Sequence, residues 1–383
     1  MKLAINLFLS VAMLALSLWL IWPNHETGEY LRAAIDQLTV RDFGPYLLGY
    51  FALLSVVHVC RSWRWHYLLE PIGVRLDFAR LLAVSSVGFM AILLVPARLG
   101  EFVRPALIRK KGHVSAAAAL GTVAVERIID GLIVSLMVFG CFFALRGPEA
   151  PGWMMPTAYI ALGIFAVATV GLLLALRWPA ATVRTSLRIS LLPWVWPRLA
   201  ERIEGKLLDL IRGFAVMKQP KQLAAFAAWS LAYWGINGVS TWLLARGMGL
   251  DLSLLGAMAT MGLVAVGISL PNSPGLVGQF QWLTVLGLSL DLGRAAAEKG
   301  TPLYAQVLAY AIIIHALQVI WYVGTGLAAL ATRHVSFSEL WASRKLDPEA
   351  SAGHAPASEP VDPLPVARAR ARAGVAGAGV GED

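Results

Sequence analysis

Six charged side chains stand inside apolar stretches of this sequence, or directly behind them, at spacings of about one helical turn. They are Arg98, Glu101 and Arg104 in the stretch VPARLGEFVRP, residues 95–105, and Glu126, Arg127 and Asp130 in the apolar run 114–145. On a helix, side chains three or four residues apart lie on one face, so each trio can form a polar stripe. Three guanidinium groups balance three carboxylates, and two neighbouring stripes can therefore pair.

The chemistry of these stripes follows from where they lie. An ionised side chain near the centre of a bilayer costs about 2.5 to 3.5 kcal/mol even on the lenient insertion scale, so the charges must be paired, near an interface or in a wet cavity. Arginine favours bidentate binding of carboxylate or phosphate. We hypothesise that Arg98, Arg104 or Arg127 releases an internal carboxylate and takes the phosphate of a lipid. The alternative is a structural ion-pair cluster that fixes helix register.

The surrounding sequence is that of an integral membrane protein. Of 383 residues, 58% are hydrophobic and 14% charged, and the mean hydropathy is +0.66, whereas soluble domains contain about 25% charged residues. Long uncharged runs recur at residues 3–22, 46–60, 81–95, 157–176, 223–245, 252–290 and 303–332. We therefore expect an all-α polytopic fold with about 7 to 9 membrane helices, of which one or two are re-entrant or broken.

Basic residues predict the topology, because Lys and Arg collect on the cytoplasmic side of a membrane. The strongly basic loop between the runs 157–176 and 223–245 should be cytoplasmic. Two further basic clusters flank the run 81–95: Arg61, Arg64, Arg75 and Arg80 before it, and Arg98, Arg104, Arg109, Lys110 and Lys111 after it. Both clusters face the cytoplasm only if this run enters the membrane and returns. We predict a re-entrant hairpin at 79–97, where Ser85, Ser86 and Gly88 suit a turn or close packing.

A second interruption lies in SLPNSPGLVGQFQW, residues 269–282. Pro271 and Pro274 remove backbone donors, and Gly275 and Gly278 loosen the helix, so a continuous helix is not expected here. The segments VPARLGEF and LPNSPGLVGQF are weakly alike. Paired broken helices in the two halves of a chain point to the binding site of a transporter. The likeness leaves two interpretations open, an internal inverted repeat and a chance similarity.

The remaining segments define the domain organisation. Residues 199–217 have apolar side chains at helical spacing, which predicts an amphipathic helix on the inner membrane surface or one packed on the protein's own loops. Residues 1–335 are interpreted as one polytopic membrane domain. Residues 336–383 are rich in Ala, Pro and Gly with few large apolar side chains, so they should form a disordered cytoplasmic tail.

Three motifs together carry a resemblance to a known family. The pattern P-x-R-x-G-E-x-x-R at 96–104 is followed by E-R-x-x-D at 126–130 and by P-x-x-P-G-x-x-G at 271–278. In this order they resemble the lysylphosphatidylglycerol synthase transmembrane, or flippase-like, family. Many members have Glu shortly after the last glycine, where this chain has Gln281, so a mechanism with an acid there does not carry over. By matching motif, the family implies functional positions at Arg98, Gly100, Glu101, Arg104, Glu126, Arg127, Asp130, Pro271, Pro274, Gly275 and Gly278. Pro96 and Gln281 are interpreted as further residues of the broken helices.

The resemblance implies a polytopic lipid transporter of the bacterial inner membrane, in which a phosphate-bearing lipid, such as aminoacylated phosphatidylglycerol or an isoprenoid lipid, moves between leaflets. Fewer than fifty residues follow the last apolar run, so we expect no aminoacyl transfer by this chain. The sequence has no GxxxxGK[ST] loop, no clear metal-ligand spacing and no indication of a cofactor or a nucleic-acid partner. Alternatives are an intramembrane enzyme acting on a lipid or polyprenyl phosphate, with Glu101 or Asp130 as base or metal ligand, and a partner subunit of a separate lipid-modifying enzyme.

Overall fold

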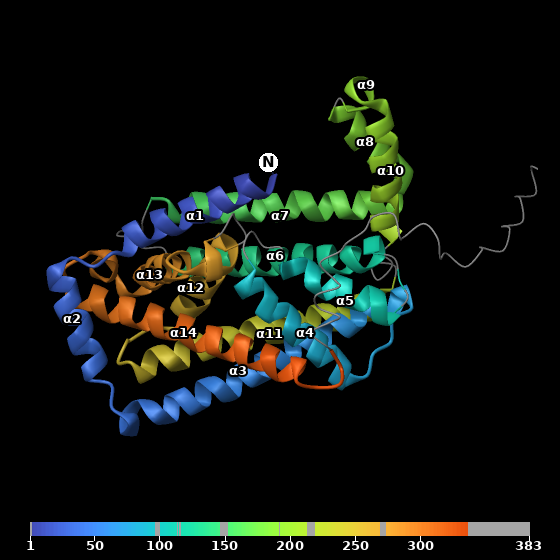
Figure 1. Cartoon of the computed structure of the whole chain (residues 1–383). Helices are drawn as coiled ribbons and strands as arrows, with labels where there is room; N and C mark the ends of the chain where they lie inside the picture. Colours follow the sequence, from blue (N-terminus) through green and yellow to red (C-terminus); the bar gives the residue numbers. More distant parts are fainter. Residues whose placement is uncertain are drawn as a thin grey trace, which may run out of the picture. The chain divides into compact units, whose positions relative to one another are not determined.

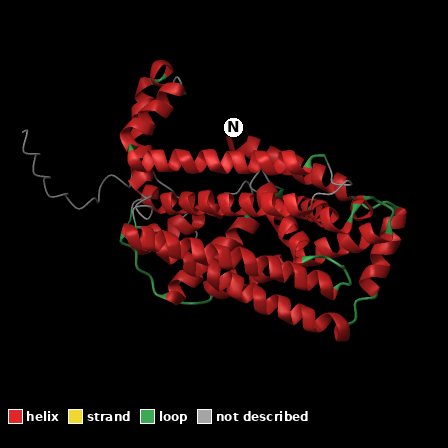
Figure 2. Cartoon of the chain, turned by 180° about the vertical axis from the view of Figure 1, so that it is seen from behind, coloured by secondary structure: helices red, strands yellow, loops and turns green. Residues whose placement is uncertain are grey.

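The computed structural model describes residues 2–95, 100–112, 114, 116–145, 152–190, 192–212, 219–268 and 273–335. Within these ranges the chain is built from helices and loops, without a strand (Figure 2). The prediction of an all-α fold is therefore confirmed. The tail predicted at 336–383 and its boundary lie outside the described residues.

The helices follow one another closely along the chain (Figure 1). In order they are α1 (Lys2–Ile21), α2 (His25–Asp36), α3 (Val40–Leu69), η1 (Glu70–Ile72), α4 (Phe78–Leu94), α5 (Val103–Gly112), α6 (Ala116–Leu145), α7 (Met154–Arg177), α8 (Pro179–Ile189), α9 (Leu192–Val195), α10 (Pro197–Arg212), α11 (Pro220–Gly247), α12 (Leu254–Gly267), η4 (Pro274–Leu276), α13 (Gln279–Leu292), η5 (Arg294–Ala297) and α14 (Pro302–Leu330).

Four helices of the described chain are long and apolar enough to cross a membrane. They lie in Val40–Ile72, Ala118–Leu145, Met154–Ala175 and Pro302–Leu330, which belong to α3, α6, α7 and α14. The 28-residue α11 packs antiparallel along α3. Its end at Gly247 meets Tyr46 near the start of α3, and Ser230 near its own start bonds Arg64 near the end of α3. Because α11 runs beside a spanning helix over most of its length, it traverses the same thickness.

The helix α4 and its partner α5 form a hairpin that starts and ends at one end of the bundle. This end, where α7 stops and α8 starts, is called the α8 end below; the opposite end, where α3 and α14 begin beside α2, is the α2 end (Figure 1). α4 starts after α3 with Asp77 as N-cap, whose carboxylate accepts a hydrogen bond from the Arg80 backbone N–H at 3.2 Å. α5 leads back towards α6. The predicted re-entrant hairpin therefore exists.

The bounds of this hairpin differ from the prediction of 79–97. α4 is helical from Phe78 to Leu94, so the chain does not turn near Ser85, Ser86 and Gly88. These small residues are buried and serve close packing instead, as Gly88 lies directly under the aliphatic part of the Arg104 side chain. The hairpin includes α5 as its second arm, because α4 ends at Leu94 and the described chain from Gly100 onward runs back along it.

A second hairpin, α12 and α13, enters from the α2 end. Ser253 caps α12 through its hydroxyl, which accepts a hydrogen bond from the Gly256 backbone N–H at 3.0 Å. The Ser253 backbone N–H in turn donates to Asp291, near the end of α13, at 2.6 Å. Both open ends of the hairpin are thus held together, and its tip, which includes η4, points into the bundle. The break predicted between Pro271 and Gly278 is present, with described residues from Ser273 onward.

The two halves repeat the same arrangement in opposite directions. α3, the hairpin α4–α5 and α6 correspond to α11, the hairpin α12–α13 and α14. α4 packs on α14, the last helix of the other half, and α12 packs correspondingly on α6. One hairpin enters from each end of the bundle (Figure 1). This arrangement is an inverted repeat, and the described residues of the weakly similar sequences VPARLGEF and LPNSPGLVGQF lie next to its two corresponding tips.

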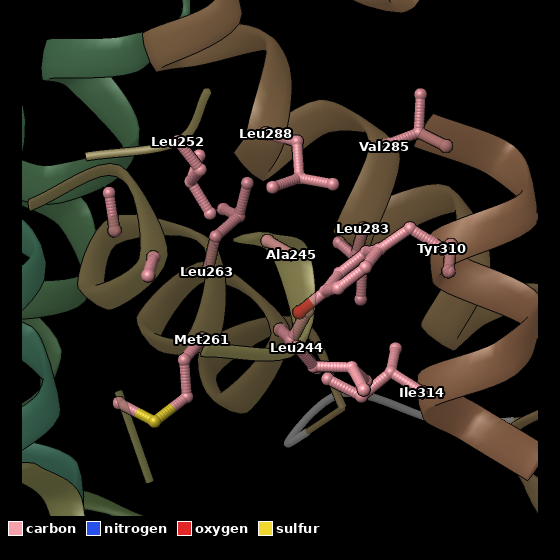
Figure 3. Close-up of a cluster of buried hydrophobic side chains, with 14 of the residues drawn as sticks. Leu244, Ala245, Leu252, Met261, Leu263, Leu283, Val285, Leu288, Tyr310 and Ile314 are labelled. Carbon is pink, nitrogen blue, oxygen red and sulfur yellow. The ribbon is translucent and has the colours of Figure 1, made fainter. Parts of the chain in front are cut away.

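Apolar packing holds each hairpin against its long helices. One cluster is formed mainly by the second half, where residues such as Leu244, Leu263, Leu283 and Ile314 meet from α11, α12, α13 and α14 (Figure 3). A second cluster surrounds Trp65 between α3, α4, α5 and α6. Each hairpin is therefore held in place by a cluster of buried apolar side chains.

The basic segment after α7 forms the short helices α8, α9 and α10. α10 spans Pro197–Arg212, whereas the amphipathic prediction covered 199–217; residues 213–218 lie outside the described residues. α10 contacts α8 and the α6 helix. A surface ion pair joins Arg184 of α8 to Glu204 of α10, with 3.0 Å between nitrogen and oxygen.

Candidate functional site

A buried ion network connects the first half of the fold to α11. It consists of Arg64 on α3, Arg104 on α5, and Glu126 and Asp130 on α6, and all four side chains are buried. Arg64 binds Asp130 through both of its terminal nitrogens, at 2.5 and 2.6 Å, and binds Glu126 at 2.9 Å. Arg104 binds Glu126 at 3.0 Å. Two guanidinium groups thus neutralise two carboxylates.

Further contacts hold the ion network in place. Arg64 donates to the Ser230 hydroxyl at 3.0 Å, and the Trp234 indole N–H donates to Asp130 at 3.3 Å, both from α11. The Arg104 guanidinium carbon lies 4.0 Å from the centroid of the Trp65 ring. The electron-rich ring face stabilises a cation where water is excluded. The ion network therefore ties α3, α5, α6 and α11 to one geometry.

A cavity of about 520 Å³ lies beside the ion network, between the two hairpins and the long helices. Residues of both hairpins line it, including Leu93 and Glu101 near the first tip and Leu276 and Phe280 near the second. The tips touch, since a Cβ placed on Gly275 would lie 3.9 Å from the Leu93 carbonyl oxygen. Cavities that hold small molecules in proteins usually measure about 300 to 1,000 Å³, so this one is large enough for a polar headgroup.

One part of the cavity wall is charged. Arg61 of α3, Glu101, and Arg127 and Asp130 of α6 all line the cavity. The Arg61 guanidinium lies 4.0 Å from the centroid of the Phe89 ring. Among the described residues, no carboxylate lies within ion-pair distance of Arg61 or Arg127. Together with the ion network, the described residues bring four guanidinium groups and three carboxylates to this place, an excess of one positive charge among them.

The structure separates the five described members of the six predicted charges into two groups. Arg104 and Glu126 pair as the spacing predicted, but they belong to the buried ion network and do not line the cavity. Glu101 and Arg127 do line it, and Asp130 contributes to both. Asp130 is bound by Arg64, which the sequence-based pairing had not included. Pro96 and Arg98 lie outside the described residues.

Gly100 allows the first tip to fold back on α4. A Cβ at this position would overlap the backbone of Ala91 and Ile92. Only a glycine therefore permits the chain to lie so close to α4, and the conformation places the neighbouring Glu101 at the cavity. The motif glycine predicted at the broken helix thus has a steric role in the structure.

The second tip is built from residues with positive φ. Gly275 has φ 61° and Gly278 has φ 79°, and Leu276 between them has φ 62°. Pro274 begins the short turn η4. This left-handed backbone is readily adopted by glycine and rare for side chains such as that of leucine. Pro271 lies outside the described residues.

Gln281 and His315 hold this tip in place. The Gln281 side-chain oxygen accepts from the Gly278 backbone N–H at 2.8 Å, so its nitrogen donates to His315 Nδ1, also at 2.8 Å. His315 Nε2 then donates to the Gly275 carbonyl at 3.0 Å. An amide has the donor and the acceptor that this chain of bonds requires. Gln281 is therefore a structural clamp between α13, α14 and the tip.

Sequence reasoning missed Arg61 and Arg64 as parts of the site and assigned them to a basic cluster beside a loop. α3 continues for 30 residues to Leu69, and both arginines lie within it. The signal that could have found them is the aromatic setting RSWRWHYLL, without Gly or Pro before Pro71, which is typical of a continuing helix. Asn237, His315 and Gln318 also line the cavity.

Paired hairpins from opposite ends, long apolar helices and a charged internal cavity define a multi-pass helical membrane protein of the inverted-repeat class. The chain belongs to the family described as the lysylphosphatidylglycerol synthase TM region, whose model matches residues 7–326. The match covers α2 to α13 and most of α1 and α14. It therefore includes both hairpins and the residues that line the cavity.

One curated relative is "Glycosyltransferase AglD" of Haloferax volcanii. It is 23% identical over 324 residues, which cover 78% of this chain and 50% of that protein. The chain thus spans half the length of this curated relative. No solved structure matches the chain.

Proposed function

We propose that this protein moves a phosphate-bearing lipid between the leaflets of the membrane. The headgroup occupies the cavity, while the acyl chains remain in the surrounding lipid. The observation that carries the proposal is the pair Arg61 and Arg127, which face a cavity at membrane depth without an ion-pair partner among the described residues. Each such charge is costly in a membrane unless an anion or water meets it.

The phosphate fits the charge and the geometry of this wall. One phosphodiester carries the single negative charge that balances the excess guanidinium, and its oxygens suit the planar donors of arginine. Arg64 and Arg104 already hold Asp130 and Glu126. They keep the wall rigid, so that Arg61 and Arg127 bind the headgroup without rearrangement of the ion network.

The inverted repeat supports a transport cycle. Two corresponding hairpins enter from opposite ends and touch at the cavity, so a small movement of either tip opens the cavity to one side only. The sequence contains no phosphate-binding loop for ATP. Movement is downhill or coupled to the membrane potential, which supplies about 2.3 kcal/mol per charge per 100 mV.

In the proposed orientation, the α8 end and the C-terminal tail lie in the cytoplasm of a bacterial cell. The chain of α7 then runs from the outside to the cytoplasm. Arg177, Arg184 and Arg188 all lie at this end. Basic residues beside membrane helices favour the cytoplasmic side.

The test is lipid movement in proteoliposomes that contain fluorescent phosphatidylglycerol, with bleaching of the outer leaflet. Arg127→Gln should slow movement roughly tenfold to a hundredfold, because a hydrogen bond to a charged group contributes about 1.5 to 3 kcal/mol. The matched control is Arg32→Gln on α2, whose side chain is exposed. Equal rates in Arg127→Gln and the wild type would contradict the proposal.

A second candidate function rests on the name of the curated relative. A chain that acts as an intramembrane glycosyl- or polyprenyl-phosphate transferase would use the same cavity for the phosphate. The two functions are separated by the purified wild-type protein. Product formation without lipid movement, across anionic and isoprenoid lipids, would favour the enzyme, and neither activity would favour a partner subunit.

A further inference from the structure

The cavity has two chemically different parts. The charged part contains Arg61, whose guanidinium carbon lies 5.9 Å from the centroid of the Tyr322 ring on α14. The other part lies nearer the α2 end, around Tyr310 of the same helix (Figure 3), whose hydroxyl donates to the Thr241 carbonyl at 2.8 Å. Tyr310 and Tyr322 are twelve positions apart on α14, so they are about 18 Å apart along the helix axis at 1.5 Å per residue.

The polar side chains of this second part are uncharged. They include Asn237 and Thr241 of α11, Thr260 of α12 and Thr284 of α13, and they stand among apolar residues such as Ile314. The described lining carboxylates are Glu101 and Asp130, on the segments that carry the charged part. One long helix and a hairpin thus contribute neutral hydrogen-bonding groups to one region of the cavity.

The three threonines present acceptors to this region. Each hydroxyl donates its proton to a carbonyl four residues earlier in its own helix, at 3.0 Å for Thr241, 2.7 Å for Thr260 and 2.8 Å for Thr284. A hydroxyl has one proton and two lone pairs. The lone pairs therefore remain available for O–H groups of a bound molecule.

Asn237 supplies both donors and an acceptor. Its side chain is half-buried and lines the cavity one helical turn before Thr241. A side-chain amide has two N–H donors and a carbonyl acceptor. At this position it can exchange hydrogen bonds with hydroxyl groups of a bound molecule.

We propose that the lipid carries an uncharged, hydroxyl-rich group beyond its phosphate, such as glycerol, inositol or a sugar. This inference rests on the proposed function, because it assumes that the phosphate lies at Arg61 and Arg127. The hydroxyls then donate to the threonine oxygens and exchange hydrogen bonds with the Asn237 amide. An ammonium group beside the three threonines would meet hydroxyl oxygens and no carboxylate, because the described lining carboxylates, Glu101 and Asp130, belong to the charged part. This penalises aminoacylated or ethanolamine headgroups.

The test measures equilibrium binding of short-chain lipids to the full-length protein in detergent by titration calorimetry. The probes are dihexanoyl phosphatidylglycerol, phosphatidylethanolamine and phosphatidic acid. We expect phosphatidylglycerol to bind at least about tenfold more tightly than phosphatidylethanolamine. Asn237→Leu should weaken phosphatidylglycerol binding roughly twofold to tenfold, the range for neutral hydrogen bonds, and leave phosphatidic acid unchanged.

Two further variants sharpen the result. Thr260→Val, which keeps the shape and removes the acceptor, should weaken phosphatidylglycerol binding in the same direction. The control is Thr169→Val on α7, where the hydroxyl makes the same bond within its helix, to the Phe165 carbonyl at 2.7 Å, but does not line the cavity.

The outcomes separate this inference from the proposed function. Equal affinity for phosphatidylglycerol and phosphatidylethanolamine, or an equal loss for all three probes in Asn237→Leu, would overturn the hydroxyl-rich headgroup. Selective binding without movement in proteoliposomes would support the headgroup assignment and contradict transport. Absence of binding for every probe would overturn both.

Discussion

The clearest test of the ion network is to remove Arg64. In Arg64→Met, a side chain of similar length loses four hydrogen bonds, two to Asp130, one to Glu126 and one to Ser230. Glu126 retains Arg104, whereas Asp130 retains, among the described residues, the Trp234 N–H at 3.3 Å. The variant thus leaves one buried carboxylate nearly uncompensated.

The magnitude follows from the burial. Removal of one partner from a buried ion pair costs about 3 to 5 kcal/mol, and 1 kcal/mol shifts the Tm of a large domain by roughly 2 °C. We expect Arg64→Met to unfold roughly 6 to 10 °C below the wild type in detergent. Arg127→Gln should shift the Tm by much less, because no described carboxylate lies within ion-pair distance of Arg127.

A double variant distinguishes the lost ion pair from lost packing. Arg64→Met combined with Asp130→Asn removes the stranded charge and keeps an acceptor for Trp234. It should unfold at a higher temperature than Arg64→Met alone. The explanation is wrong if Arg64→Met melts with the wild type, or if the double variant is less stable than the single one.

Two other substitutions test the hairpin tips by the same thermal unfolding. Gly100→Ala should cost at least about 1 to 3 kcal/mol, because its Cβ would overlap the backbone of Ala91; Gly163→Ala on α7, where a Cβ meets nothing within 4 Å, is the matched control and should be neutral or stabilising. Equal effects of these two changes would refute the steric role of Gly100. Gln281→Leu should cost about 1 to 3 kcal/mol, since it leaves the Gly278 N–H and His315 Nδ1 without partners. An unchanged Tm in Gln281→Leu would show that the clamp is dispensable.

Much of the architecture was predictable because the membrane restricts it. Apolar runs and basic clusters predicted long helices and a hairpin whose ends share one side, and Pro and Gly marked the tip at 273–278. The helical spacing of charges predicted that two neighbouring stripes could pair, and the structure shows one such pair, Arg104 with Glu126. The two alternatives left open for the similar tip sequences are now resolved in favour of an inverted repeat.

The spacing of the charged residues in the sequence did not predict which of them belong to the buried ion network and which line the cavity. Arg64 is more than sixty residues from Glu126 and Asp130 in sequence, and only the packing of α3 on α6 and α11 brings it to them. The positive-inside rule predicts a side of the membrane for such an arginine but not its depth, since a helix can bury an arginine that carboxylates neutralise. Likewise, Gln281 was compared with an acid, whereas its bonds to Gly278 and His315 require an amide.

The peripheral position of α7 has a consequence for how the protein is made. α7 packs mainly on α6, and its side chains Ile160, Ile164 and Val167 are exposed. The first repeat crosses the membrane twice and so returns the chain to the side where α3 began. One additional crossing must follow before the second repeat can insert upside down, and α7 provides it. α7 therefore makes the number of crossings between the two repeats odd. If a nascent chain left this crossing out, both hairpins would enter the membrane from the same side.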